Sequence, residues 1–191
     1  MSRSTRSFGT SAGAAARAFA LAVALTTAPA FAMADRAPPL PASVVALAPD
    51  LKAQGGGELT FFGLSVYDGW YWSPARGWPH SAPYALDLHY HRSLDGAKIA
   101  QRSVDEIAKL GYGTPDERTR WGALMAKIFP DVARGDRLTG VYTGAGAVRY
   151  FHNGKPIGEI AEPGFAKAFF GIWLDPKTSR TDFREKLLGQ R

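Results

Sequence analysis

The chain contains no cysteine among its 191 residues. That absence excludes disulfide bonds, thiol nucleophiles, zinc–thiolate sites and iron–sulfur clusters. A folded domain of this sequence must therefore be stabilised by its apolar core alone. With 46% hydrophobic and 12% aromatic residues, the sequence has enough apolar material for such a core.

The N-terminal apolar run, Ala18–Leu25, is too short to cross a bilayer, which needs about 20 residues. It follows a basic segment without acidic residues (Arg3, Arg6 and Arg17) and precedes two overlapping Ala-x-Ala sites within residues 30–34. This pattern predicts a Sec-type signal peptide over residues 1–34, and so export to a periplasm with no membrane span after cleavage. The alternative, an uncleaved anchor helix, is disfavoured by the length of the run.

The chain also has little excess charge of one sign. Removing the three arginines of residues 1–34 from 23 basic residues, against 17 acidic ones, leaves a net charge of +3 on the remaining 157 residues. Basic and acidic residues are interleaved rather than clustered, so we expect no nucleic-acid partner. A chain of this size forms one domain.

Recognisable phosphate and metal motifs are missing as well. Gly55-Gly56-Gly57 precedes a predicted strand instead of opening a helix, which excludes a phosphate-binding loop. Asp87, His89 and His91 share one strand face and could ligate a metal, but their spacing matches no known site. We interpret them as an exposed polar sheet face and expect neither a metal nor a cofactor.

The pattern of residues predicts separate groups of strands and helices. Residues 35–54 are rich in proline and alanine and are expected to form an extended lead-in, with the domain proper at residues 55–191. Tyr84, Leu86, Leu88 and Tyr90 alternate with more polar residues, which predicts a strand with one apolar face. The other predicted strands are 58–72 (one bent strand or two), 137–142, 148–152 and 155–160, and the predicted helices are 99–110, 116–128, 164–174 and a last helix capped by Thr178 or Ser179.

Runs of strands and helices in this order indicate an α+β fold with an antiparallel sheet. The helix at 164–174 carries aromatic residues around most of its circumference. It is therefore either sandwiched between layers, which we favour, or lines an apolar cavity.

Several segments match, in order, a known family, over roughly residues 55–189. They are Gly63–Trp72, Ala85–Arg92, Arg102–Glu106, Trp121, Ile128–Val132, Gly135-Asp136, Asn153-Gly154 and Phe170–Leu174. Together they resemble a bacterial exported chalcone isomerase-like protein. The resemblance implies an open-faced sandwich, an antiparallel sheet covered on one side by helices, with a ligand cleft between them. Members of that superfamily cyclise chalcones, bind fatty acids or act as non-catalytic partners.

The catalytic set of the cyclising enzymes does not carry over to this sequence. In those enzymes an Arg near the start of the first strand, a Thr on the next strand, and a Tyr and an Asn on the following helix serve the substrate phenolate and a water. Residues 54–62 contain no Arg, and ungapped alignment places Val66, Ile99 and Glu106 at the other three positions. An anionic Glu106 would oppose a phenolate. We therefore do not expect chalcone cyclisation.

Our first hypothesis is a binding protein for a small apolar or amphipathic ligand, such as a fatty acid. Tyr67, Tyr71 and Trp173 are the candidate pocket walls, and Arg92 or Arg102 the candidate partner of a ligand carboxylate.

Two alternatives stay open. One is an isomerase or intramolecular lyase in which Glu106, His89 or Tyr71 transfers protons. The other is a structural partner in an envelope complex, which predicts an exposed apolar patch and no cavity.

Overall fold

The computed structural model of the protein describes residues 36–190. The predicted signal peptide, residues 1–34, lies outside this part of the chain. Across residues 36–190, no helix combines the length and the apolar character that a membrane span requires.

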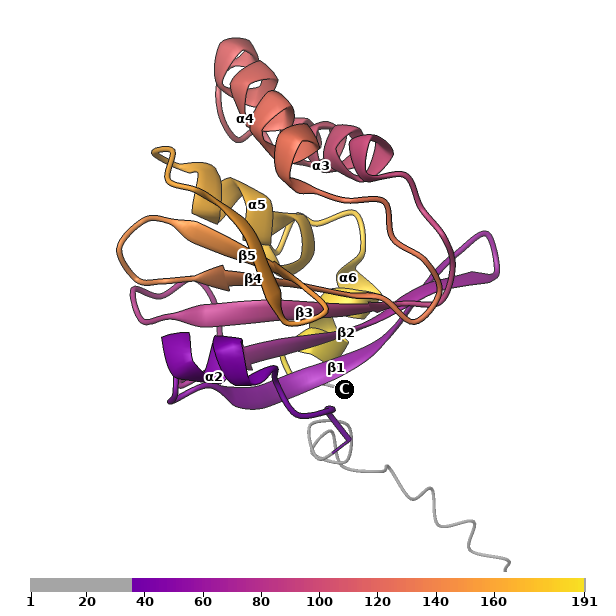
Figure 1. Ribbon diagram of the computed structural model, residues 1–191. Coiled ribbons are helices and arrows are strands. Elements are labelled where there is room, and N and C mark those ends of the chain that lie inside the picture. Colours follow the sequence, from indigo (N-terminus) through magenta and orange to yellow (C-terminus); the bar gives the residue numbers. More distant parts are fainter. Residues whose placement is uncertain (1–35, 191) are drawn as a thin grey trace, which may run out of the picture.

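A single six-stranded antiparallel sheet forms the centre of the molecule, with its strands side by side in chain order (Figure 1). The strands are β1 (Lys52–Phe61), β2 (Leu64–Ser73), β3 (Tyr84–Tyr90), β4 (Arg137–Tyr142), β5 (Val148–His152) and β6 (Lys155–Ile160). The α+β prediction is thus confirmed. Of the two possibilities for residues 58–72, two strands is the correct one.

Two hairpins have tight two-residue turns. Asn153 and Gly154 join β5 to β6 with φ of +50° and +78°, and Phe62 and Gly63 join β1 to β2 with φ of +47° and +74°. Turns with positive φ at both central residues match the twist of the flanking strands, and Asn-Gly is the preferred pair. Asn153-Gly154 therefore suits the turn between the predicted strands 148–152 and 155–160, whereas Phe62 gives no such sequence signal.

The helices cover mainly one face of the sheet (Figure 1). They are α2 (Ala42–Leu47), α3 (Gly96–Lys109), α4 (Pro115–Ile128), α5 (Phe165–Leu174) and α6 (Thr181–Leu187). Helix α3 starts where the Asp95 carboxylate accepts a hydrogen bond from the Lys98 backbone N–H at 3.0 Å. Helix α4 starts with a capping box between Thr114 and Glu117.

The predicted cap of the last helix is wrong. Arg180 occupies the N-cap of α6, without a side-chain cap. The Thr178 hydroxyl donates instead to the Ile172 carbonyl at 2.6 Å, and the Ser179 hydroxyl donates to the Glu106 carboxylate at 2.8 Å. Both hydroxyls therefore hold α5 and α3 in place rather than starting α6.

The segment before residue 55 is not the extended lead-in that its composition predicts. It forms α2 and the first residues of β1. Val44 of α2 is fully buried, and it packs with Trp70 and Trp72 in a second apolar cluster, on the sheet face opposite to α3–α6. The segment is thus part of the core, because it shields the large indole rings on that face from solvent.

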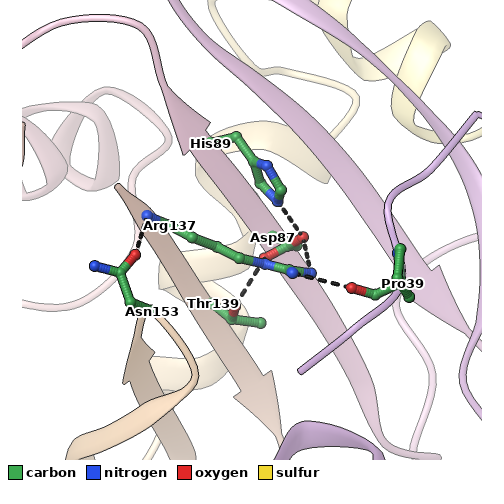
Figure 2. A network of polar contacts seen from close by, with 6 residues as sticks. All are labelled: Pro39, Asp87, His89, Arg137, Thr139 and Asn153. Atoms are coloured by element: carbon green, nitrogen blue, oxygen red, sulfur yellow. Dashed lines mark hydrogen bonds and ion pairs between the residues drawn. The ribbon is translucent and has the colours of Figure 1, made fainter. Parts of the chain in front are cut away.

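That second face also holds a buried ion pair, where the sequence predicted an exposed polar surface (Figure 2). Asp87 is 0% exposed and accepts hydrogen bonds from Arg137 Nε at 2.8 Å, Arg137 Nη2 at 2.6 Å and the Thr139 hydroxyl at 2.7 Å. His89 Nε2 lies 3.0 Å from the same carboxylate. Arg137 Nη1 also donates to the Pro39 carbonyl at 3.0 Å, so the network fastens the N-terminal segment to the sheet.

The charge of Asp87 follows from these contacts. Burial acts to raise the pKa of Asp87, but the hydrogen bonds from His89 and Arg137, together with the Arg137 charge, outweigh it and hold the pKa below its ordinary value. The carboxylate is therefore ionised in the folded protein at neutral pH.

Candidate functional site

A cavity of about 450 Å³ lies between the sheet and the helices α3 and α5. Its floor is the apolar face of the sheet, where strand alternation directs Leu86, Leu88 and Tyr90 of β3 toward the helices. Gly140 of β4 also lines the floor. A Cβ at this position would lie 3.4 Å from the Tyr150 and Phe169 rings, in van der Waals contact with both.

Helix α5 provides one wall and part of the core at the same time. Phe169, Ile172 and Trp173 line the cavity at helical spacing. On another side of the helix, Phe170 is fully buried, and its ring centroid lies 4.7 Å from that of Tyr84. The two alternatives for this aromatic helix, a sandwiched position and a cavity wall, therefore both hold.

Three tyrosine side chains line the cavity: Tyr67, Tyr90 and Tyr150. The Tyr67 hydroxyl accepts a hydrogen bond of 2.8 Å from Trp173 Nε1, which ties β2 to α5. Burial raises the pKa of Tyr67 to about 12, and it raises the pKa of Tyr90 and Tyr150 as well. All three phenols are neutral, so they place hydroxyl groups but no negative charge on the wall.

Tyr150 is among the most deeply buried residues of the cavity lining, at 2% exposed. Its ring packs edge-on against Phe129 and Phe169, with centroid distances of 5.0 and 5.4 Å. Its hydroxyl is buried and has no hydrogen-bond partner among the described residues. An unsatisfied buried hydroxyl is unfavourable, so this group destabilises the ligand-free protein.

We expect Tyr150→Phe to raise the free energy of unfolding of the ligand-free protein by about 1 kcal/mol, because it removes the unsatisfied hydroxyl and leaves the ring packing intact. Urea unfolding measures the change. The matched control is Tyr67→Phe, which removes the acceptor of Trp173 Nε1 and should lower stability by about 1 kcal/mol. A Tyr150→Phe variant that loses as much as the control would contradict this interpretation.

The exposed end of the cavity is basic. Six charged side chains line the cavity: Arg92, Asp95, Lys98, Arg102, Glu106 and Arg180. Four of them are cations and two are anions. Arg102 Nη2 lies 2.6 Å from Glu106, and Arg180 Nη1 donates to the Thr60 carbonyl at 2.7 Å. The side chains of Arg92 and Lys98, by contrast, make no hydrogen bond or ion pair with any described residue, which leaves both free for an anionic ligand group.

Glu106 is held firmly in its charged form. Burial acts to raise the pKa of Glu106, but hydrogen bonds from Lys109 at 2.9 Å and Ser179 at 2.8 Å, with the Arg102 charge, outweigh it and lower the pKa. A general base works best with a pKa near the operating pH. The pKa of Glu106 is instead lowered, so this carboxylate is better suited to an ion pair than to proton transfer.

Most of the predicted site residues meet at this cavity. Tyr67, Arg92, Arg102, Trp173 and the candidate base Glu106 all line it. Val66 and Ile99, which alignment places at two positions of the catalytic set, line it as well. The sequence comparison thus identified wall positions, although the residue types differ from those of the cyclising enzymes.

Tyr71 and His89 lie elsewhere. The Tyr71 hydroxyl donates to the Gly77 carbonyl and lies 3.1 Å from His80 Nε2, near the end of β2 and outside the cavity lining. His89 points to the second face of the sheet because it alternates with Leu88 and Tyr90. The structure therefore does not bring the three candidate proton-transfer residues together.

The possible metal ligands are only partly brought together: His89 lies 3.0 Å from Asp87, but His91 pairs elsewhere. His91 Nε2 lies 3.0 Å from Asp68, whereas Asp87 is enclosed by Arg137 and Thr139.

Sequence reasoning missed several residues of the cavity lining, among them Lys98, Tyr150 and Arg180. Lys98 is four residues before Arg102 on α3, so helical spacing could have indicated it. Arg180 reaches the cavity from the loop before α6, and Tyr150 from the fifth strand. No local pattern identifies the last two, because their positions depend on the packing of distant elements.

Comparisons with known proteins agree with this architecture. A crystal structure of a fatty-acid binding protein of Arabidopsis thaliana superimposes with a TM-score of 0.59, at 10% identity, over 74% of this chain and 88% of that one. An uncharacterized protein of Haemophilus influenzae is 27% identical over 138 residues, which are 71% of this chain and 67% of that protein. The model of the chalcone isomerase-like family matches residues 79–189. Because this match spans more than half of the chain, the protein belongs to the chalcone isomerase-like family.

Proposed function

We propose that the protein binds an amphipathic carboxylate with an apolar chain, such as a fatty acid, in the cavity between the sheet and helices α3 and α5. The observation that carries this proposal is an apolar cavity of about 450 Å³ with two unpaired cations, Arg92 and Lys98, at its exposed end. The fold shared with a fatty-acid binding protein supports it.

The distribution of charge gives the ligand a direction. Leu138, Tyr150 and Phe169 are buried residues of the lining, and their apolar surfaces suit a ligand tail. At the exposed end Arg92 is free to form paired hydrogen bonds with a carboxylate. Arg102 is already bound to Glu106, whose negative charge repels a carboxylate beside it. The ligand head therefore lies at Arg92, with Arg102 as a more distant positive charge.

The two alternatives receive less support. Proton-transfer chemistry needs an acid and a base within reach of one substrate, but of its three candidates only Glu106 lies at the cavity, and the pKa of Glu106 is lowered. A purely structural partner predicts an exposed apolar patch and no cavity. Phe61, Phe62 and Leu64 form such a patch, but the fold also contains a cavity of about 450 Å³. Ligand binding is the function that uses both the cavity and its charge.

We further propose that residues 1–34 direct export, so that the protein meets its ligand in the periplasm. The support is the basic, apolar and Ala-x-Ala pattern of those residues. N-terminal sequencing of protein recovered from the periplasmic fraction tests this. Cleavage within residues 30–35 is expected, and an intact Met1 in the cytoplasmic fraction would contradict it.

A head-group series tests the ligand class. We expect a fatty acid to raise the thermal midpoint of the protein, since a ligand that binds only the folded state stabilises it. The fatty alcohol of the same length should raise the midpoint less, because it lacks the charge that Arg92 and Lys98 would bind. If no chain length shifted the midpoint, and native mass spectrometry of the protein from periplasm showed no bound lipid, the proposal would fail.

We expect Arg92→Ala to weaken fatty-acid binding by about ten- to a hundredfold, because a hydrogen bond to a charged group contributes about 1.5–3 kcal/mol. Isothermal titration calorimetry measures the affinity. Lys127→Ala, an exposed cation of α4 outside the cavity lining, is the matched control and should bind as the wild type does. An equal loss of affinity for the fatty alcohol would show that Arg92 acts through packing rather than charge.

A further inference from the structure

The tip of the β1–β2 hairpin is the most exposed apolar part of the described chain. Four large hydrophobic side chains are exposed within residues 36–190, and three of them are at this tip: Phe61 at 50%, Phe62 at 90% and Leu64 at 54%. Figure 1 shows the hairpin extending outward from the body of the sheet. A cluster of this kind on an otherwise polar surface is a sign of an interaction site.

Local folding does not account for the residue at the apex. Phe62 has φ of +47°, a left-handed conformation that is unfavourable for a residue with a bulky side chain. The same kind of turn between β5 and β6 has Asn153 at the equivalent position. Phe62 therefore strains the turn and buries nothing. A strained residue that is almost fully exposed points to a function outside the fold itself.

The tip is continuous with the basic end of the cavity. Phe61 lines the cavity, and the Arg102 guanidinium lies 6.0 Å from the centroid of the Phe61 ring. Arg180 binds the Thr60 carbonyl in the same hairpin. With Arg92 and Lys98 nearby on the cavity lining, exposed aromatic rings and cations form one surface around the entrance.

We propose that this hairpin docks on an anionic lipid bilayer, with Phe62 and Leu64 inserted at the interface and the cations against the lipid headgroups. Phe and Leu side chains are typical of the apolar face of interfacial membrane anchors, and a basic residue near an anionic surface adds to binding. A specific protein interface buries about 800 Å² on each partner, for which a two-residue turn is a poor platform. A narrow, convex apolar tip beside cations fits a lipid surface better.

Docking in this way places the cavity entrance at the membrane. An amphipathic ligand could then pass between bilayer and cavity without crossing water. This transfer step rests on the proposed function, whereas the docking itself rests only on the hairpin and the cations. The two can therefore fail separately.

Vesicle sedimentation of the full mature protein with Phe62→Asn tests the docking. We expect the wild type to bind phosphatidylcholine vesicles that contain phosphatidylglycerol, and the variant to bind them about tenfold or more weakly. Asparagine suits the turn, so the variant should unfold at a higher temperature than the wild type. Val45→Asn is the matched control: it removes an apolar side chain that is 43% exposed on α2 and should leave vesicle binding unchanged.

Each outcome decides one point. Equal vesicle binding by Phe62→Asn and the wild type would overturn the proposal. Failure of the wild type to bind the vesicles would overturn it too, and would indicate a protein as the partner of the tip. Equal binding to pure phosphatidylcholine vesicles would overturn the role of the cations. Fatty-acid titration of the same variant in solution should match the wild type. Vesicle binding without any fatty-acid binding would refute the proposed function and leave the docking intact.

Discussion

Replacing Arg137 with methionine is expected to lower the free energy of unfolding by about 3 kcal/mol, because breaking a buried ion pair leaves its other member without compensation. Asp87 is 0% exposed and would keep only His89 and Thr139 as partners. The variant also loses the hydrogen bond to the Pro39 carbonyl, which holds the N-terminal segment against the sheet.

Urea denaturation of both proteins measures this loss. Arg149→Met is the matched control: Arg149 lies on the neighbouring strand β5, and its ion pair with Glu159 is half-exposed, so the change should be less than about 1 kcal/mol. If the two variants lost equal stability, the ion pair of Asp87 would be no more important than one on the surface.

The pH dependence gives a second readout of the same pair. The pKa of Asp87 is below its ordinary value of 3.8, so the ion pair contributes its full stability above that pH. As the pH falls through the lower pKa of the folded state, Asp87 is protonated and the contribution is lost. The difference in stability between the wild type and Arg137→Met should therefore narrow in acid. A difference that stayed constant down to the acid transition would argue against ionisation as the cause.

Filling the cavity should abolish ligand binding. Leu138 on β4 lines the cavity and pairs with Leu88 across the sheet. A tryptophan at position 138 would occupy the space that we assign to the ligand tail. Each methylene kept out of the cavity forfeits about 0.8 kcal/mol, so the exclusion of four weakens fatty-acid binding by more than about a hundredfold.

Isothermal titration calorimetry with a fatty acid, alongside thermal unfolding, tests Leu138→Trp. Leu47→Trp is the matched control, since Leu47 packs on the opposite face of the sheet with the second apolar cluster. It should bind the ligand as the wild type does, even if the larger ring costs some stability. Full affinity in a folded Leu138→Trp protein would place the ligand elsewhere.

The faces of the sheet could be predicted because strand alternation is local. Leu86, Leu88 and Tyr90 alternate with polar neighbours, and they do face the helices. The same pattern could not show that Asp87 is buried, since its partner Arg137 lies 50 residues away in the sequence. Nor could the composition of residues 35–54 show that Val44 covers Trp70 and Trp72. Such contacts depend on tertiary packing.

The candidate site, too, could be predicted from the sequence only in part. Family resemblance and residue type identified Tyr67, Arg92, Arg102 and Trp173, and all four line the cavity. Tyr71 was also predicted as a pocket wall, but it lies outside the cavity lining, nearer the end of β2. The family resemblance implied a cleft between the sheet and the helices, but the pattern of residues alone could not predict it. A hydrophobic pattern marks which residues are buried but not where their packing leaves a space.

A crystal structure of the mature protein with a bound saturated fatty acid tests the central claim most directly. The account predicts one fatty acid between the sheet and α5, its tail against Tyr150 and Phe169 and its carboxylate within hydrogen-bond distance of Arg92. A fatty acid bound outside this cavity, or one with its carboxylate at the Tyr150 end, would contradict it.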